Sequence, residues 1–219
     1  MTLMPFVFHG CLAVRELVGP EAWDARALLE GVGQVSDEML FTHTAGTMLR
    51  RPVQGDAWPN DFALWAATEL GDQALAERLA MVDVFDAGSL DALRANLVAV
   101  LEDHLHRGPV ATAPVPAREP FVFLRSHVVP VPLGVTASTL REFRDGLAVV
   151  DASALFYHVV EVRYRLGRDR GDFAEWTEHG LGRADLAERL ARIDAHVGSL
   201  ERIRDRCLGV LEDGLVPGS

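Results

Sequence analysis

Two histidines and two aspartates occur in repeated sequence motifs and are the residues best suited to chemistry. His43 ends Leu-Phe-Thr-His and His158 ends Leu-Phe-Tyr-His, while Asp61 and Asp172 each begin Asp-Phe-Ala-x-Trp. A neutral imidazole can bind a metal or act as a general base near neutral pH, and a carboxylate can act as an acid or orient the base. His43 and Asp61 are therefore the candidate catalytic pair.

Tryptophans near these aspartates suggest a surface for a small ligand. Trp58 and Trp65 flank Asp61 in the sequence. An indole ring can stack on the C–H face of a sugar while a carboxylate accepts hydrogen bonds from its hydroxyls. The candidate ligand-binding residues are His43, Thr44, Trp58, Asn60, Asp61, Trp65, His158, Asp172 and Trp176.

The same residues also have a purely structural interpretation. A histidine in apolar surroundings can donate to a backbone carbonyl or a helix cap and so fix the packing of the core. Asp61 and Asp172 stand where a helix N-cap accepts backbone N–H bonds, an interaction worth about 1 kcal/mol. No further His, Cys, Asp or Glu cluster accompanies the histidines, so we predict no metal site and no cofactor.

The two sets of motifs are not equally equipped for binding. Val159 and Gly171 stand where the first set has Thr44 and Asn60, and Trp58 has no counterpart. A small-ligand cleft is therefore expected in the first half. The second half adds a cluster of arginines that forms a solvated face or holds a phosphate or an acidic partner: Arg163, Arg165, Arg168 and Arg170.

Other segments recur in the same order, including Pro-Phe-Val-Phe at 5–8 and 120–123 and Leu-Ala-Glu-Arg-Leu-Ala at 75–80 and 186–191. The sequence thus predicts a mainly α protein, a tandem duplication of a roughly five-helix unit. Each unit is expected to open with a short strand, and the two strands could pair with each other. The expected domains are repeat 1 (1–107), a Pro-rich linker (108–119) and a degenerate repeat 2 (120–219), with one joint core as an alternative.

Helix-capping signals mark several expected helices. Pro20-Glu21 predicts the start of a first helix, Ser36 that of a second, which carries His43, and Asn60-Asp61 that of a third. Asp72 and Ser89 predict the starts of two more.

Composition restricts the partners of the chain. A formal net charge of −11 at pH 7 argues against nucleic acid and against an anionic membrane surface, because both attract Lys and Arg. We find no apolar run of the ~20 residues that a membrane span needs and no signal peptide, so a cytoplasmic location is expected. The two cysteines, Cys11 and Cys207, lack the context of a disulfide or a catalytic thiol.

The repeated run Leu-Phe-x-His, Asp-Phe-Ala-x-Trp, Leu-Gly and Leu-Ala-Glu-Arg-Leu-Ala resembles a prokaryotic family listed as domain of unknown function number five-seven-five-two. The resemblance covers nearly the whole chain and suggests two tandem copies of the family domain. It implies no activity. The matching positions are His43, Asn60, Asp61, Phe62, Trp65, Leu70, Gly71 and Asp83, then His158, Gly171, Asp172, Phe173, Trp176, Leu181, Gly182 and Asp194.

Three hypotheses of function follow. The first, which we favour, is a non-enzymatic module that binds a protein partner or a small ligand. The second is an enzyme acting on a carbohydrate or a phosphorylated metabolite, with His43 as base, Asp61 as acid or orienting group and Trp58 and Trp65 as platform. The third is a metal-binding protein. The sequence leaves the oligomeric state open.

Overall fold

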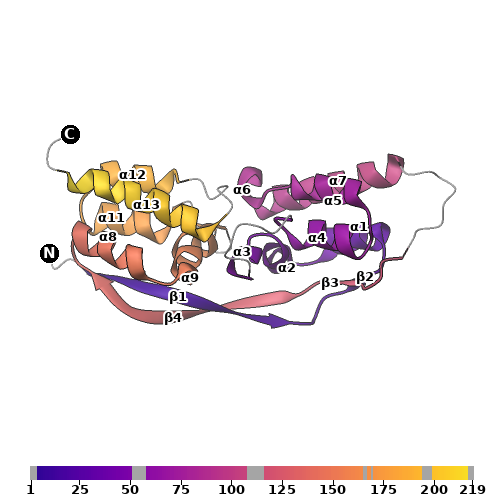
Figure 1. The fold of residues 1–219 in the computed structure, drawn as a ribbon, viewed down its shortest axis with the longest axis horizontal. Coiled ribbons are helices and arrows are strands. Elements are labelled where there is room, and N and C mark those ends of the chain that lie inside the picture. The colour runs from indigo at the N-terminus through magenta and orange to yellow at the C-terminus, as the bar shows by residue number, and fades with distance from the viewer. Residues whose placement is uncertain are drawn as a thin grey trace. The chain divides into compact units, whose positions relative to one another are not determined.

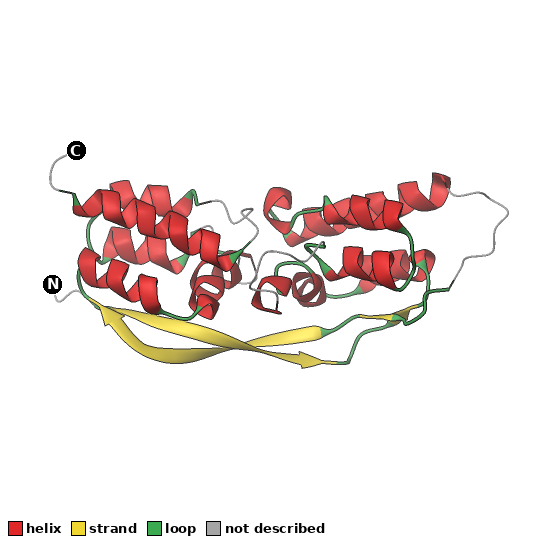
Figure 2. Cartoon of the chain, viewed as in Figure 1, coloured by secondary structure: helices red, strands yellow, loops and turns green. Residues whose placement is uncertain are grey.

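The computed structural model describes residues 4–50, 58–107, 116–164, 167–168, 170–193 and 199–216. Most of the expected linker, as well as Arg165 and Asp194, lies outside these ranges. Two strands, β1 (Phe6–Glu16) and β4 (Arg125–Ala137), pair in one sheet (Figures 1 and 2). A second small sheet joins β2 (Glu21–Ala22) to β3 (Phe121–Val122), with Ala22 opposite Phe121.

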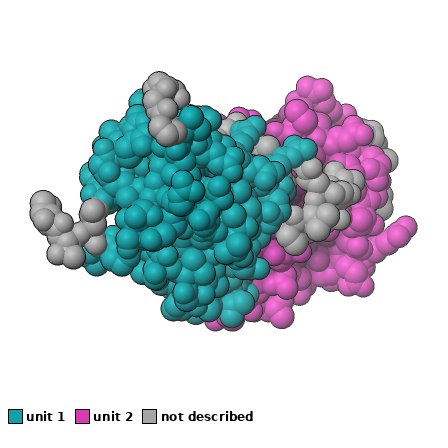
Figure 3. Space-filling view, turned by 60° about the vertical axis from the view of Figure 1, so that its left-hand side comes forward, with its two compact units in different colours: residues 1–13, 128–219 teal, residues 14–127 magenta. Residues whose placement is uncertain are grey.

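The chain forms two compact units, coloured separately in Figure 3. Unit 1 consists of residues 1–13 and 128–219, and unit 2 of residues 14–127. Each unit is therefore bounded inside the long strands and not at the expected linker. The boundaries 1–107 and 120–219 remain a prediction about the sequence, whereas the contacts divide the chain at β1 and β4.

Unit 2 is built mainly from short helices around a buried core. Its helices are α1 (Ala25–Gln34), α2 (Asp37–His43), α3 (Thr47–Arg50), α4 (Asp61–Thr68), α5 (Gln73–Ala80), α6 (Val84–Ala87) and α7 (Leu90–Arg107). Side-chain oxygens of Ser36, Asn60 and Asp72 cap α2, α4 and α5, which confirms the predicted starts of these helices. The first expected helix forms as α1, but its predicted start at Pro20-Glu21 is wrong: Glu21 belongs to β2, and α1 begins at Ala25 after the cap Asp24.

In unit 1, helices lie on one side of β1 and β4 (Figure 1). They are α8 (Leu140–Val149), α9 (Ala152–Leu155), the π-helix η1 (Phe156–Glu161), α10 (Val162–Tyr164), α11 (Asp172–His179), α12 (Ala184–Ala191) and α13 (Leu200–Leu215). Phe6 and Phe8 of β1 point into this unit, where Phe8 stacks on Phe143 of α8 with ring centroids 5.3 Å apart. Phe8 also fills the space over Gly146, where an added Cβ would come within 2.8 Å of its ring.

The predicted fold class is wrong. The described residues form an α/β structure with two antiparallel sheets, and not the predicted mainly α tandem duplication of a roughly five-helix unit that opens with a short strand. Its compact units are not consecutive stretches, because residues 1–13 complete the unit that otherwise comes from residues 128–219. The repeated motifs make similar contacts in the two units. Among the described residues, no helix is both long and apolar enough to cross a membrane.

The glycines of α1 offer a test of how the extended segment after residue 116 packs in unit 2. A Cβ on Gly31 would overlap the ring of Phe123, while a Cβ on Gly33 would meet no atom within 4 Å. We predict that Gly31→Ala lowers the free energy of unfolding by about 1–3 kcal/mol through overpacking. Gly33→Ala, the matched control, should raise it by roughly 0.5–1 kcal/mol because alanine favours the helix.

Denaturant unfolding of both variants measures the difference. Equal stabilisation by the two substitutions would mean that Phe123 does not pack against α1.

Candidate functional site

His43 is buried in unit 2, and both of its ring nitrogens have partners. Its side chain is buried at the end of α2. The Nδ1 atom is 2.9 Å from Oδ2 of Asp61, the first residue of α4. On the other side of the ring, Nε2 accepts a hydrogen bond of 2.8 Å from the backbone N–H of Leu124. The structure therefore brings the predicted pair His43 and Asp61 into direct contact.

These two contacts determine the protonation of the ring. A backbone N–H can only donate, so Nε2 of His43 must present its lone pair and carry no proton. The proton of the neutral ring then sits on Nδ1 and is donated to the Asp61 carboxylate. Burial, the largest influence, lowers the pKa of His43 even though Asp61 acts in the opposite direction. His43 is therefore a neutral, Nδ1-protonated imidazole.

The carboxylate of Asp61 is shared between His43 and an arginine that our sequence analysis did not identify. Nη2 of Arg50, the last residue of α3, lies 2.7 Å from Oδ2 of Asp61. Burial would raise the pKa of Asp61, but the hydrogen bonds from His43 and Arg50 outweigh it and keep the pKa below its usual value. Asp61 is thus ionised and accepts hydrogen bonds from His43 and Arg50, and it is not the helix cap, a role that Asn60 takes.

Unit 1 contains the same arrangement around His158. Nδ1 of His158 is 2.8 Å from Oδ2 of Asp172, and Nε2 accepts a 3.0 Å hydrogen bond from the backbone N–H of His9. Arg168 adds a contact of 3.1 Å to the other oxygen of Asp172. Burial again lowers the pKa of His158. This histidine is therefore also neutral and protonated on Nδ1.

The two arrangements differ in their helical context and in their exposure. His158 lies within the π-helix η1, a rare geometry that is common at functional sites. The side chain of Asp172 is 22% exposed and that of Arg168 is 50% exposed, against 12% for Asp61. The His158 pair is therefore closer to solvent than the His43 pair.

Trp65, expected to form a platform with Trp58, and Trp176, a further ligand-binding candidate, instead donate hydrogen bonds to the backbone of the extended segments. The indole N–H of Trp65 donates to the carbonyl of Glu119 at 2.9 Å, and its ring meets that of Phe121 edge-on. Trp176 donates in the same way to the carbonyl of Met4 at 3.0 Å. Trp65 is buried and Trp176 half-buried. Both indoles thus serve the packing of their units.

Other residues predicted to bind a ligand are used within the fold. Asn60 is buried: its Oδ1 caps α4 at Ala63, and its Nδ2 donates to the carbonyl of Leu79 at 2.9 Å. The hydroxyl of Thr44 donates to the carbonyl of Leu40 at 2.7 Å. Trp58 is half-buried in the segment leading to α4.

The basic cluster and the cysteines also have local partners. Arg170 pairs with Glu178, and Arg163 donates to the carbonyl of Ile193 at 3.4 Å. Both thiols are buried. Burial raises the pKa of Cys207 to about 12, and burial with the nearby charge of Glu161 raises that of Cys11 to about 12. Such thiols are poor nucleophiles at neutral pH.

This arrangement limits the chemistry of both histidines. Proton uptake or metal binding at Nε2 would require that the backbone N–H of Leu124 or His9 give up its acceptor, which would leave a buried donor unpaired. Among the described residues, no group of three or more His, Cys, Asp and Glu side chains is placed to hold a metal ion. What the geometry does provide is a fixed acceptor for an extended strand in each unit.

The lowered pKa values predict a dependence of stability on pH. Both histidines bind a proton less readily in the folded chain than at the unfolded value of 6.5. The unfolded state therefore takes up more protons below about pH 6.5, and stability is complete above this pH and lost as the pH falls toward the folded-state pKa. With two such histidines, the free energy of unfolding should fall by about 2.7 kcal/mol per pH unit in that window.

Urea unfolding between pH 7.5 and 5 measures this slope. The single variants His43→Gln and His158→Gln serve as controls, since each should remove about half of it. A free energy of unfolding that stays constant across the window would contradict neutral, buried histidines.

Asp61 and Asp172 allow a matched comparison of the two pairs. Asp61→Ala leaves the Nδ1–H of His43 and the charge of Arg50 without their buried partner, so we expect a loss on the order of 3 kcal/mol. Asp61→Asn keeps an oxygen acceptor for Nδ1–H and should cost less. Asp172→Ala should also cost less than Asp61→Ala, because Arg168 and Asp172 are more exposed. Thermal and urea unfolding measure these losses of stability. Equal losses for Asp61→Ala, Asp61→Asn and Asp172→Ala would contradict a buried hydrogen bond between His43 and Asp61.

Comparisons with known proteins agree with one fold that spans the chain. The structure of OrfY from Thermoproteus tenax is similar to it, with a TM-score of 0.77, 28% sequence identity and coverage of 96% of this chain and 95% of that one. A search of curated proteins gave no match.

The model of a family of unknown function, DUF5752, matches residues 3–212. One copy of the model covers both units, so the expectation of two tandem copies of this domain is wrong. The predicted resemblance to the family itself is confirmed: the chain belongs to DUF5752, a family of unknown function.

Proposed function

We propose that the chain is a non-enzymatic binding module whose partner is a protein. The observation that carries the proposal is that each ring nitrogen of His43 and His158 already has a partner within its own unit. Polar groups that hold the fold together are not free to bind and release a substrate. The residues that looked most like a reactive site are better explained as the framework of an interaction module.

The enzyme alternative needs a general base within reach of a substrate proton. His43 could act as a base only after Leu124 had left Nε2, and that step would remove part of the unit 2 core. The metal alternative meets the same obstacle, since a metal would have to replace the N–H at Nε2. Both alternatives therefore require an opening of the unit that a protein-binding role does not.

Exposed aliphatic side chains on the strands of unit 1 favour a protein partner over a polar metabolite. Leu12 is 63% exposed, and Val129 and Val131 of β4 are also exposed. The sequence has no Asp, Glu, Lys or Arg at 1–14 or at 126–140, although 24% of the chain is charged. Uncharged surface with exposed aliphatic groups is typical of protein contacts. The cytoplasmic location remains a prediction from the sequence.

A thermal-shift screen tests this proposal against its alternatives. We predict that divalent metals, sugars, sugar phosphates and nucleotides leave the Tm of the wild-type chain unchanged, because a compound that does not bind the native state cannot stabilise it. The small-ligand cleft predicted around His43 and Trp58 would instead appear as a dose-dependent rise in Tm.

Asp61→Asn and Asp172→Asn form the control pair for any compound that raises Tm. A shift lost in Asp61→Asn but kept in Asp172→Asn would assign a small-ligand site to unit 2 and would overturn the non-enzymatic proposal.

A further inference from the structure

The first segment of β1 and the residues just before it are held in unit 1 by a short series of contacts. The carbonyl of Met4 accepts from the indole of Trp176, and the N–H of His9 donates to His158. Between these anchors, the Phe6 ring lies 4.9 Å from that of His158, and Phe8 is fully buried. Two backbone hydrogen bonds and two phenylalanines therefore fix residues 4–9.

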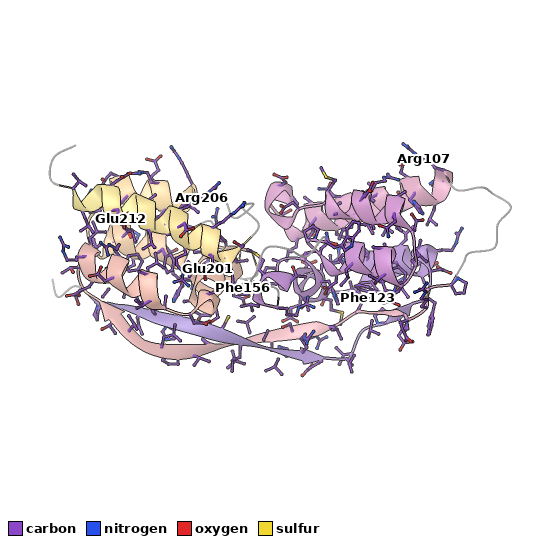
Figure 4. All side chains as sticks on the ribbon, viewed as in Figure 1. Arg107, Phe123, Phe156, Glu201, Arg206 and Glu212 are labelled. Carbon is purple, nitrogen blue, oxygen red and sulfur yellow. The ribbon has the colours of Figure 1, made fainter. Side chains whose placement is uncertain are left out.

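A different segment makes the same contacts in unit 2. The carbonyl of Glu119 accepts from Trp65, and the N–H of Leu124 donates to His43. The Phe121 ring lies 4.7 Å from that of His43, and Phe123 is fully buried. Figure 4 labels Phe123 beside the helices of this unit. In both units the bound carbonyl and the bound N–H belong to residues i and i+5.

The comparison shows which features of a segment its helical unit recognises. Both bound segments contain Pro-Phe-Val-Phe, at 5–8 and at 120–123. The residue before this motif is Met4 in one and Glu119 in the other, and the residue after it is His9 or Leu124. These flanking positions contribute only backbone atoms to the anchoring hydrogen bonds. Recognition therefore rests on backbone geometry and the two phenylalanines, as when a groove binds an extended peptide.

We propose that unit 1 is a receptor for an extended Pro-Phe-x-Phe segment and that a second copy of this chain can supply it. Within one chain, residues 1–13 connect to the rest of unit 1 only through residues 14–127 of unit 2. No covalent constraint within unit 1 thus requires the segment to come from the same chain. Exchange of an identical element between copies keeps every contact and produces a dimer at low cost. This inference rests on the proposed function, because it names the partner of the binding module.

The chemistry of the segment supports another copy as its source. Residues 1–14 contain no Asp, Glu, Lys or Arg in a chain of net charge −11, so the segment itself brings no like charge to a second copy. Docking of the uncharged segment itself should accordingly depend little on salt. A tethered segment has a high effective concentration, so the closed chain should dominate in dilute solution and the exchanged dimer at high concentration.

A labelled peptide tests the receptor. The probe is residues 1–13 with Cys11→Ser, and the receptor is the full chain carrying Phe6→Ala and Phe8→Ala, which removes the anchors of its own segment. We expect saturable binding in fluorescence anisotropy and a higher Tm of the variant. Binding should weaken by roughly tenfold or more when both phenylalanines of the peptide are replaced by alanine. The unaltered peptide should bind the wild-type chain more weakly to a similar extent, because the chain's own segment already occupies the site.

If the variant chain is unfolded, the peptide should restore its helical circular dichroism, and the double-alanine peptide should not. Equal binding of the two peptides, or no binding and no recovery of helix, would overturn the receptor. Neither result would contradict the proposed function, which is tested separately by the thermal-shift screen of metals and small molecules.

Mixing two isotopically distinct wild-type copies at high concentration tests the second copy as the source. Native mass spectrometry should then detect mixed dimers that disappear with Phe6→Ala and Phe8→Ala. Peptide binding without mixed dimers would overturn exchange between copies, and mixed dimers that survive the double substitution would do the same.

Discussion

The fold depends on one hydrogen bond in each unit, from a backbone N–H of an extended segment to Nε2 of a buried histidine. Leu124 makes it to His43 and His9 makes it to His158, at separations of 81 and 149 residues along the chain. The helices of each unit thus bind an extended segment that lies far from the histidine in the sequence. Because the acceptor must be unprotonated, this bond also sets the tautomer of the ring and the need for a carboxylate at Nδ1. The orientation of the histidine ring, its protonation state and the docking of the extended segment all follow from this one hydrogen bond.

This contact changes the meaning of a pattern that resembles a catalytic site. A histidine oriented by an aspartate is the arrangement on which many general bases rely, and there the second nitrogen faces a nucleophile or a substrate. Here the second nitrogen faces the backbone. Arg50 then stabilises the charge of Asp61 and reinforces the arrangement from the side of the carboxylate. The same groups that would make a good base instead make a buried acceptor for the backbone N–H of an extended segment.

Local signals in the sequence predicted local structure well. Ser36, Asn60 and Asp72 cap helices as expected, because a side-chain oxygen at an N-cap acts within its own turn. The repeated His and Asp motifs also indicated which polar residues to compare, and His43 and Asp61 are in contact. The fold class was predicted wrongly because Pro-Phe-Val-Phe says nothing about which helices receive it. Arg50 and the N–H of Leu124 were missed because Arg50 belongs to none of the repeated motifs and a backbone donor leaves no pattern in the sequence.

The most direct test of this account is the protonation state of the two rings. Long-range 1H–15N NMR of the full chain near pH 7 distinguishes the nitrogen that carries the proton from the one that accepts. We predict that both His43 and His158 are neutral, with the proton on Nδ1 and a hydrogen-bonded, unprotonated Nε2. A proton on Nε2 of either ring, or a charged imidazolium at this pH, would contradict the central role of the backbone hydrogen bond.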